Sequence, residues 1–331
     1  MPGPAAFPLD WRPACSLAAL KERARLLARI RAYFERQGVL EVETPSLCHC
    51  VGTDPHLDFF SVALQSGGER RLFLQTSPEF SMKRLLAAGS GSIFQICKAF
   101  RNGESGRYHN PEFSILEWYR LGYGLDRLIE DIEQLLGPEL GLAAPGQTAE
   151  CLTYQNAFIR YCGIDPLSAC ISDFRNYAQT TGDQRASEVC GEDSRWWQEY
   201  LFGLKIQPRL GHNGLCFVKD YPAEQAALAR ISAKDPRVAE RVEVFYRGVE
   251  LANGFCELRI ESEQRARFQQ DLKIRKTMAK VQPEPDERFL AALASGLPEC
   301  AGVAVGLDRV LMLLMNASSL DEVLSFPLAR A

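Results

Sequence analysis

The segment from Phe100 to Arg120, FRNGESGRYHNPEFSILEWYR, constrains the fold more than any other part of the chain. Two apolar arms, Ile93–Arg101 and Glu112–Tyr119, flank a short polar loop with glycine, which is the pattern of a β-hairpin. An isolated match of this kind favours an ordinary hairpin tip. This loop, however, also gathers side chains that can meet a polyanion, namely Arg101, Arg107, His109 and Arg120.

The composition is that of an ordinary globular protein: 331 residues, 46% hydrophobic and 24% charged. No apolar run approaches the roughly 20 residues needed to cross a bilayer. The N-terminus lacks the basic start and apolar core of a secretory signal. We therefore expect a cytoplasmic protein without membrane association.

Net charge and cysteine content indicate whether the protein binds nucleic acid and whether its thiols are oxidised or bind zinc. The net charge is −4, without a lysine run or an arginine-rich tail, which argues against extensive nucleic-acid binding. The eleven cysteines are odd in number, so we expect reduced, mostly buried thiols. Cys48 and Cys50 flank His49, but no second pair completes the four ligands of a structural zinc site.

The first part of the chain predicts alternating helices and strands. Leu17–Gln37 has apolar residues at three- and four-residue steps and predicts an amphipathic helix ending at Gly38. A strand follows, with Leu40 and Val42 expected to face inward, and it ends at Pro45. Ser77-Pro78-Glu79 has the signature of a helix start.

The remainder mixes long strands with helices. Leu125–Leu136 predicts a helix, AAPGQTAE a linker, and VEVFYRGVELANGFCEL a β-rich stretch. A strand from Gly302 to Gly306 precedes a helix that begins at Asp308. Because the strands and helices lack regular βαβ spacing, we predict an α+β fold with a mainly antiparallel sheet flanked by helices.

Two of these segments resemble sequence motifs of the class II aminoacyl-tRNA synthetases. Phe100–Arg120 is similar to motif 2, and GVAVGLDRVLML is similar to motif 3. The N-terminal helix, glycine, strand and proline resemble motif 1, which builds the dimer interface in that family. Together the motifs resemble the lysine-specific branch of that family. The phrases EVETP, TSPEF, GRYHNPEF, LEWYR and GVELANGF most closely resemble a free-standing paralogue subfamily of that branch. The resemblance implies a homodimer, with a class II catalytic domain over residues 16–331 after a lead-in of residues 1–15.

Amino-acid activation joins a carboxylate to the α-phosphate of ATP, so the enzyme must position two anions and screen their charge. The resemblance makes Arg101 the bidentate donor to the α-phosphate and Arg309 the γ-phosphate ligand in the first turn of a helix, and we take both as catalytic. Phe113 would stack under adenine. The implied ATP-binding set is Arg101, Asn102, Gly103, Arg107, His109, Asn110, Phe113, Glu250, Leu251, Gly306 and Arg309.

The resemblance also implies that Glu243 and Glu250 bind Mg²⁺, whose preferred ligands are oxygens. Their odd spacing would place them on opposite faces of a straight strand, unless the turn-like YRG before Val249 realigns them.

For the substrate, the resemblance places Glu79 at the amino end of the amino acid and Glu117, Tyr119 and Glu257 around the side-chain ammonium. Two buried carboxylates with no internal cation are costly, and a ligand ammonium removes that cost. The alternative is two ordinary surface glutamates. The implied substrate-binding set is Ser77, Pro78, Glu79, Glu117, Tyr119, Asn253, Glu257 and Ala304.

Lysyl-tRNA synthetases of this class carry an anticodon-binding OB-fold domain before motif 1, whereas here motif 1 begins near residue 20, so no such domain is expected. The chain therefore resembles the free-standing paralogue family that attaches lysine, preferably (R)-β-lysine, to a lysine of elongation factor P. This resemblance implies ATP and Mg²⁺ as cofactors, elongation factor P as partner and no tRNA.

Two departures from the synthetase pattern affect this interpretation. Ala304 replaces a motif 3 glycine, and its methyl group could disfavour an α-amino group and suit a β-amino group. Gly103 stands where the family has a glutamate that helps to recognise the nucleotide, and Glu104 follows it. A minimal lysyl-tRNA synthetase and a non-catalytic paralogue that binds lysine remain as alternatives.

Overall fold

The computed structural model describes residues 11–64, 71–142 and 149–331. Contacts divide the chain into two compact units. The first comprises Met1–Tyr119, Arg259–Pro298 and Ala304–Ala331, and the second comprises Arg120–Leu258 and Glu299–Val303. This division does not test the expectation of one catalytic domain over residues 16–331, which stays a prediction.

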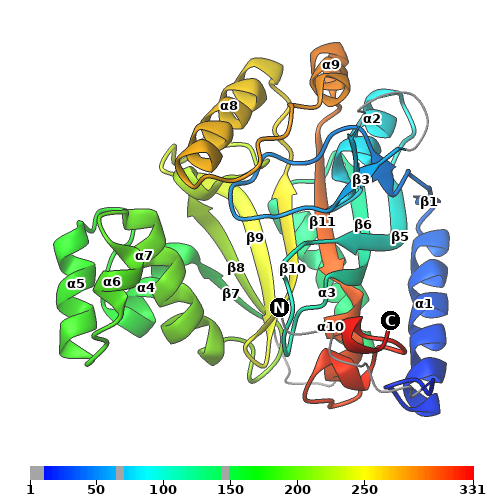
Figure 1. Ribbon diagram of the computed structural model, residues 1–331, viewed down its shortest axis with the longest axis horizontal. Coiled ribbons are helices and arrows are strands. Elements are labelled where there is room, and N and C mark those ends of the chain that lie inside the picture. Colours follow the sequence, from blue (N-terminus) through cyan, green and yellow to red (C-terminus); the bar gives the residue numbers. More distant parts are fainter. Residues whose placement is uncertain (1–10, 65–70, 143–148) are drawn as a thin grey trace, which may run out of the picture. The chain divides into compact units, whose positions relative to one another are not determined.

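The first unit combines helices with a small sheet and three strands of a larger sheet (Figure 1). Strand β5 pairs in parallel with β1 and antiparallel with β6, and β4 pairs antiparallel with both β2 and β3. Its helices and strands are α1 (Leu17–Arg36), β1 (Leu40–Glu41), β2 (Leu47–Cys48), β3 (Ser61–Ala63), β4 (Arg71–Leu74), α2 (Glu79–Ala87), β5 (Ile93–Phe100), β6 (Glu112–Leu121), α8 (Glu261–Thr277), α9 (Glu287–Gly296) and α10 (Leu307–Leu314).

The second unit joins an antiparallel sheet to a group of short helices (Figure 1). Strands β10, β9 and β8 pair antiparallel in that order, and β7 lies parallel to β8. Its elements are α3 (Leu125–Glu139), β7 (Glu150–Thr153), α4 (Tyr154–Cys162), α5 (Ile171–Thr180), α6 (Ala186–Cys190), α7 (Ser194–Leu201), β8 (Cys216–Pro222), β9 (Val238–Tyr246) and β10 (Val249–Cys256). Strand β11 (Cys300–Gly306) crosses from this unit into the first. The predicted α+β fold with mainly antiparallel pairing is confirmed.

Helix α1 forms almost as the sequence predicts. The Ser16 hydroxyl accepts a hydrogen bond from the Ala19 amide at 3.2 Å and so caps the first turn. The prediction for the strand after this helix is wrong in two respects. Strand β1 covers only Leu40–Glu41, and Leu40 is exposed whereas the preceding Val39 is buried. Strand β1 pairs with β5, but the described residues leave the Leu40 side chain 55% exposed because little packs against the face of the sheet that it occupies.

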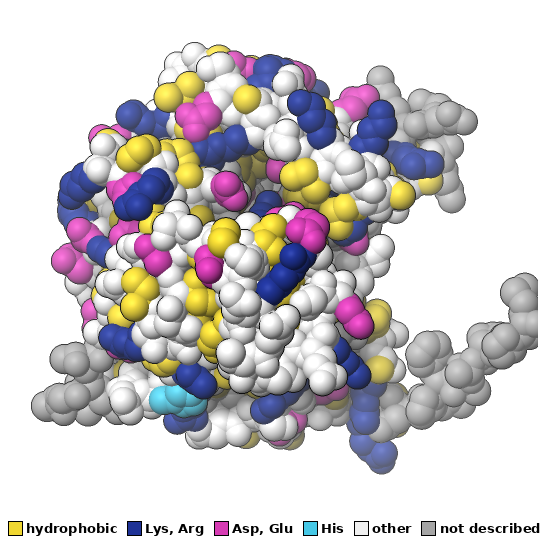
Figure 2. Space-filling model, turned by 90° about the vertical axis from the view of Figure 1, so that its left-hand side faces the viewer, with side chains coloured by type: hydrophobic (Ala, Val, Ile, Leu, Met, Phe, Trp, Pro, Cys, Tyr) yellow, Lys and Arg dark blue, Asp and Glu magenta, His cyan; other side chains and the backbone are white. Residues whose placement is uncertain are grey.

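The helices α4–α7 pack around an aromatic core that includes Tyr154, Phe158 and Trp197. Trp197 is fully buried and its indole N–H donates to the Gly191 carbonyl at 3.1 Å, whereas Trp196 remains partly exposed. Trp197 therefore packs in the core of this group of helices. On the face displayed in Figure 2, basic and acidic side chains are interspersed.

The cysteines, possible metal ligands, helix hydrophobicity and the predicted linker complete the description of the fold. All eleven cysteines are free thiols. Within the described residues no cluster of potential metal ligands includes Cys48 and Cys50. None of the described helices is long and apolar enough to span a membrane. The predicted linker AAPGQTAE lies almost wholly outside the described residues.

Candidate active site

The hairpin predicted from Phe100–Arg120 is present, and its register brings an arginine over an aromatic ring. Strands β5 and β6 pair so that Ala99 lies opposite Phe113. The Arg101 guanidinium, just beyond the end of β5, lies 5.1 Å from the centre of the Phe113 ring. The Nε of Arg101 is buried and has no hydrogen-bond partner among the described residues. A buried donor without a partner is costly, so this atom is suited to a ligand acceptor.

The Gly103 departure has a local structural explanation. Gly103 has a φ of +81°, in the left-handed region that glycine adopts without strain. The chain thus turns back, and the Glu104 carboxylate comes within 3.7 Å of the Arg101 guanidinium. Glu104 therefore lies beside the arginine, and whether it takes over the nucleotide contact of the family glutamate stays a prediction.

The hairpin tip contacts the motif 3 helix within the first unit. Arg309, in the first turn of α10, donates from Nε to the Tyr108 carbonyl at 3.1 Å, and its Nη2 lies 2.8 Å from the His109 ring Nε2. Gly306 is the N-cap residue of this helix. Arg309 and His109, which lie 200 residues apart in the sequence, are thus neighbours in the structure. The predicted phosphate site needs both of them at one place.

Two other predicted ATP ligands are anchored to the C-terminal segment. Arg107 donates from Nε to the Ser318 carbonyl at 2.6 Å. The Asn110 amide oxygen accepts from the Leu328 N–H at 3.1 Å. These contacts fasten the hairpin tip to the segment after α10. Asn102 and Gly103 are exposed in the same loop.

Arg120, which could have met a polyanion, has a structural role instead. It is buried and pairs bidentately with Asp131 of α3, at 2.7 Å from Nε and 2.8 Å from Nη2. A guanidinium held in this way by a carboxylate is not available to a phosphate.

The predicted substrate carboxylates of the first unit lie in one polar cluster. Glu117 is 2% exposed, and its two oxygens accept from the Tyr119 hydroxyl at 2.7 Å and the Ser77 hydroxyl at 3.2 Å. Ser77 also accepts from the Glu79 amide at 3.0 Å, one residue after the N-cap Pro78, so the start of α2 positions the cluster. The surface-glutamate alternative is therefore wrong for Glu117.

Sequence analysis missed an internal cation in this cluster. Lys83 is 1% exposed and its ammonium lies 2.6 Å from the Glu79 carboxylate. The assumption that no internal cation serves these carboxylates is therefore wrong. The signal was available, because Glu79 and Lys83 are four residues apart in a predicted helix and such pairs face one another.

One carboxylate is nonetheless left without its own cation. Burial, reinforced by the charge of Glu79, raises the pKa of Glu117 to about 8, although the Tyr119 and Ser77 hydroxyls and Lys83 act in the opposite direction. A buried carboxyl group that prefers its neutral form is a receptor for an added positive charge.

In the second unit, a hairpin and a bulge align the two predicted metal ligands. Strands β9 and β10 are joined by Arg247 and Gly248, which have φ of +51° and +75°, so the turn has the positive φ values of a two-residue hairpin. Glu250 pairs with Phe245, the register then shifts by a bulge, and Asn253 pairs with Glu243. Because side chains on one strand alternate, Glu243, Glu250 and Asn253 all lie on one face.

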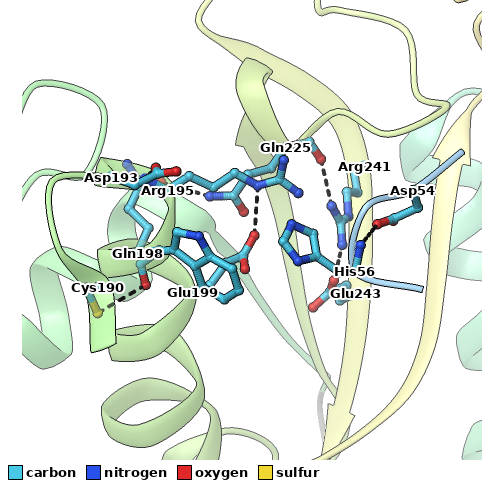
Figure 3. Close-up of polar contacts among 11 residues, drawn as sticks. Asp54, His56, Cys190, Asp193, Arg195, Gln198, Glu199, Gln225, Arg241 and Glu243 are labelled. Atoms are coloured by element: carbon cyan, nitrogen blue, oxygen red, sulfur yellow. Dashed lines mark hydrogen bonds and ion pairs between the residues drawn. The ribbon is translucent and has the colours of Figure 1, made fainter. Parts of the chain in front are cut away.

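Glu243 is held by two donors on that face. The Tyr221 hydroxyl donates to one carboxylate oxygen at 2.6 Å, and Arg241 donates to the other at 2.5 Å, a contact drawn in Figure 3. Burial raises the pKa of Glu243, Arg241 opposes this effect and the charge of Glu250 adds to it. A carboxylate destabilised by a second carboxylate on the same face belongs to a donor set that fits a divalent cation.

The remaining predicted residues are placed on the same elements. Glu257, just after β10, is 2% exposed, and its amide donates to the Cys300 carbonyl at 3.1 Å. It too is buried, contrary to the surface alternative. Leu251 is the bulged residue of β10 and is buried. Ala304 lies partly buried in β11.

The chain is similar to known proteins over nearly its whole length. Residues 8–330 match the family described as class II tRNA synthetases (D, K and N). The chain is 46% identical over 326 residues to the elongation factor P--(R)-β-lysine ligase of Sodalis glossinidius, covering 97% of this chain and 98% of that protein. The proteins of the same name from Vibrio cholerae (46% identity, 97% and 99% covered) and Pectobacterium carotovorum (47% identity, 97% and 98% covered) are equally similar.

Proposed function

Since the chain belongs to the class II tRNA synthetase family of the D, K and N group, we propose that it is an ATP-dependent ligase that attaches (R)-β-lysine, or lysine, to a lysine of elongation factor P. The single observation that carries this proposal is the 46–47% identity, over nearly the full length of both proteins, to relatives of that name. The polar cluster around Glu117 supports a substrate with a cationic side chain.

The proposed reaction has two steps. A carboxylate oxygen of the amino acid attacks the α-phosphorus of ATP, and the bond to pyrophosphate breaks. The neutral ε-amine of the acceptor lysine then attacks the carbonyl carbon, AMP leaves with the electron pair of the cleaved bond, and the amine loses a proton. Neither step needs a protein nucleophile, so positioning and charge stabilisation supply the catalysis.

The residues of the first unit have clear tasks in this scheme. Arg101 would hold the α-phosphate, since its Nε is a buried donor without a partner among the described residues. Phe113, beneath the same guanidinium, would receive the adenine ring. Arg309 would bind the γ-phosphate at the first turn of α10, where free backbone amides favour an anion.

Recognition of the amino acid would depend on the charges in the Glu117 cluster. Glu117 and Tyr119 would meet the side-chain ammonium, and Glu79 the other amino group. Lys83 already pairs with Glu79, so the cluster lacks one positive charge when both carboxylates are ionised. The missing positive charge favours binding of a cationic amino acid over a neutral one.

We propose that Glu243 and Glu250 hold Mg²⁺, because the hairpin and bulge place both on one face. When bound, the ion would neutralise phosphate charge during adenylate formation. Asn253, Leu251 and Glu257, on or next to the same strand, would complete the nucleotide and amino-acid contacts.

We also infer a homodimer that forms through motif 1, and a catalytic machinery contained in residues 16–331. Helix α1 and strand β1 belong to the first unit, and they expose the apolar side chains Leu17 and Leu40. Exposed apolar side chains on a motif 1 element are consistent with burial by a second copy. The molar mass in solution, measured by light scattering, tests this inference.

One experiment separates this function from its alternatives. The protein is incubated with ATP, Mg²⁺ and radiolabelled lysine or (R)-β-lysine, and then with either elongation factor P or tRNA. Label on elongation factor P is the expected result. Label on tRNA would identify a minimal synthetase, and failure to form an adenylate would identify a non-catalytic paralogue.

A further inference from the structure

A buried carboxylate at the start of α10 contacts two other elements of the first unit. Asp308 is 2% exposed and lies in the first turn of that helix, directly before Arg309. One of its oxygens accepts a hydrogen bond from the Ser114 amide of β6 at 2.7 Å. The Arg23 guanidinium of α1 lies 2.7 Å from the other oxygen, and α10 lies beside α1 in Figure 1. Asp308 therefore ties α10 to both β6 and α1.

The contact between Ser114 and Asp308 lies between two residues that we assign to ATP. Ser114 follows Phe113, which would stack with adenine, and Asp308 precedes Arg309, which would bind the γ-phosphate. Consecutive residues are joined by a planar peptide bond of fixed length, so holding Ser114 to Asp308 limits how far Phe113 and Arg309 can move apart. One ATP molecule must fit both residues at once. Their separation therefore matters more to ATP than to a ligand that meets only one of them.

The Arg23 guanidinium also cancels a charge that would weaken ATP binding. A carboxylate next to the γ-phosphate ligand would repel the triphosphate if it had no cation of its own. Both side chains of this ion pair are largely buried, so water and salt screen their attraction only weakly. Arg23 in addition donates to the Val323 carbonyl at 3.2 Å, which helps to hold the guanidinium in place.

We propose that Asp308 is a positioning residue that sets the separation between Phe113 and Arg309, and that Arg23 holds and neutralises Asp308. This inference rests on the proposed function, because it takes ATP as the substrate that spans both residues. It adds to that function two residues, one of them in α1, that the predicted ATP-binding set does not contain.

The test measures the affinities for ATP, AMP and inorganic tripolyphosphate by isothermal titration calorimetry in the wild type, D308N and R23Q. The amide that D308N introduces keeps the shape of the side chain but has one acceptor oxygen instead of two, so it cannot serve Ser114 and Arg23 from both sides. We expect ATP to bind about tenfold more weakly to D308N. AMP and tripolyphosphate should each change by less than about twofold, because each meets only one end of the site.

The second variant tests the role of the cation. R23Q leaves the contact between Asp308 and Ser114 in place but removes the charge partner of the carboxylate. We expect ATP and tripolyphosphate to bind about fivefold more weakly to R23Q, and AMP, which carries less charge, to change little. The matched control is E287Q, which removes an ion pair between two other helices of the same unit, Glu287 of α9 with Arg265 of α8 at 2.8 Å. E287Q should bind all three ligands as the wild type does.

The possible results lead to distinct conclusions. An equal loss of affinity for all three ligands in D308N would overturn the inference, because it would show a general loss of structure. Wild-type ATP affinity in folded D308N would also overturn it while leaving the proposed function intact. If thermal unfolding shows that D308N does not fold, R23Q decides, and unchanged ATP affinity in that variant overturns the inference. If the wild-type protein bound no ATP, the proposed function would fail, and the inference with it.

Discussion

Binding of the substrate ammonium should release a proton from Glu117. The carboxyl group is buried, its pKa is raised to about 8 by that burial and by Glu79, and Lys83 is already paired with Glu79. At pH 7 Glu117 is therefore about nine-tenths protonated in the empty cluster. Because a bound ammonium requires the ionised form, the carboxyl proton must leave as the amino acid arrives.

The magnitude follows from the distance between the working pH and this pKa. Each pH unit below the pKa costs about 1.4 kcal/mol to ionise the group. The affinity for lysine should therefore fall about tenfold per unit well below pH 8, and about 80-fold between pH 8.5 and pH 6. Lysine itself keeps its side-chain charge throughout this range.

Isothermal titration calorimetry at pH 7 in phosphate and in Tris separates proton release from binding heat. The wild type should release about 0.9 proton per lysine bound. E117Q should release none and lose the pH dependence. The matched control is E112Q, on the same strand, because the Glu112 side chain is 54% exposed and pairs at the surface with Lys98.

The same shift has a consequence for stability, with a definite sign. The pKa of Glu117 is raised above its ordinary value of 4.5 in the folded protein, so this group stabilises the fold at acid pH. Its contribution is lost as the pH rises from about 4.5 through 8 in the absence of substrate.

Two results would refute the predicted proton release from Glu117. One is wild-type binding of lysine that releases no proton, and the other is equal lysine affinity at pH 6 and pH 8.5.

Three further predictions concern stability and specificity. Asp131→Asn should lower the free energy of unfolding by about 3–5 kcal/mol in urea denaturation, because it leaves the buried Arg120 guanidinium without its charge partner. Gly254→Ala should cost about 1–3 kcal/mol in the same assay, since its Cβ would lie 2.9 Å from the Gly302 carbonyl oxygen. Ala304→Gly should shift preference toward α-lysine in ATP–pyrophosphate exchange, and an unchanged ratio between the two isomers would contradict the proposed role of the methyl group.

The elements that sequence predicted best are those whose determinants are local. Helix α1 has its cap, its apolar repeat and its terminal Gly38 within one stretch, and its bounds agree with the prediction to within one residue. Strand β1 was predicted less well because the exposure of its side chains depends on what packs against each face of the sheet, which alternation along one segment does not encode.

The candidate site shows the same division between local and non-local information. The spacing of Glu79 and Lys83 is sufficient to predict their ion pair, because a helix sets which residues are neighbours. Nothing local predicts that Arg309 lies beside His109, since 200 residues separate them. Resemblance to a family supplied that pairing in advance, and the structure gives its geometry.

Arg241 makes one contact that local sequence predicts and one that it does not. Residues two apart on a strand share a face, so Arg241 beside Glu243 could have been inferred from RVE in the sequence. Its contact with Asn253 could not, because that contact depends on a bulge at Leu251 that shifts the register of β10 by one residue. Without the bulge, Asn253 would face away from Arg241, and Glu250 alone would share a face with Glu243. The bulge therefore joins the two proposed functions of this hairpin, metal binding and amino-acid recognition, on a single surface.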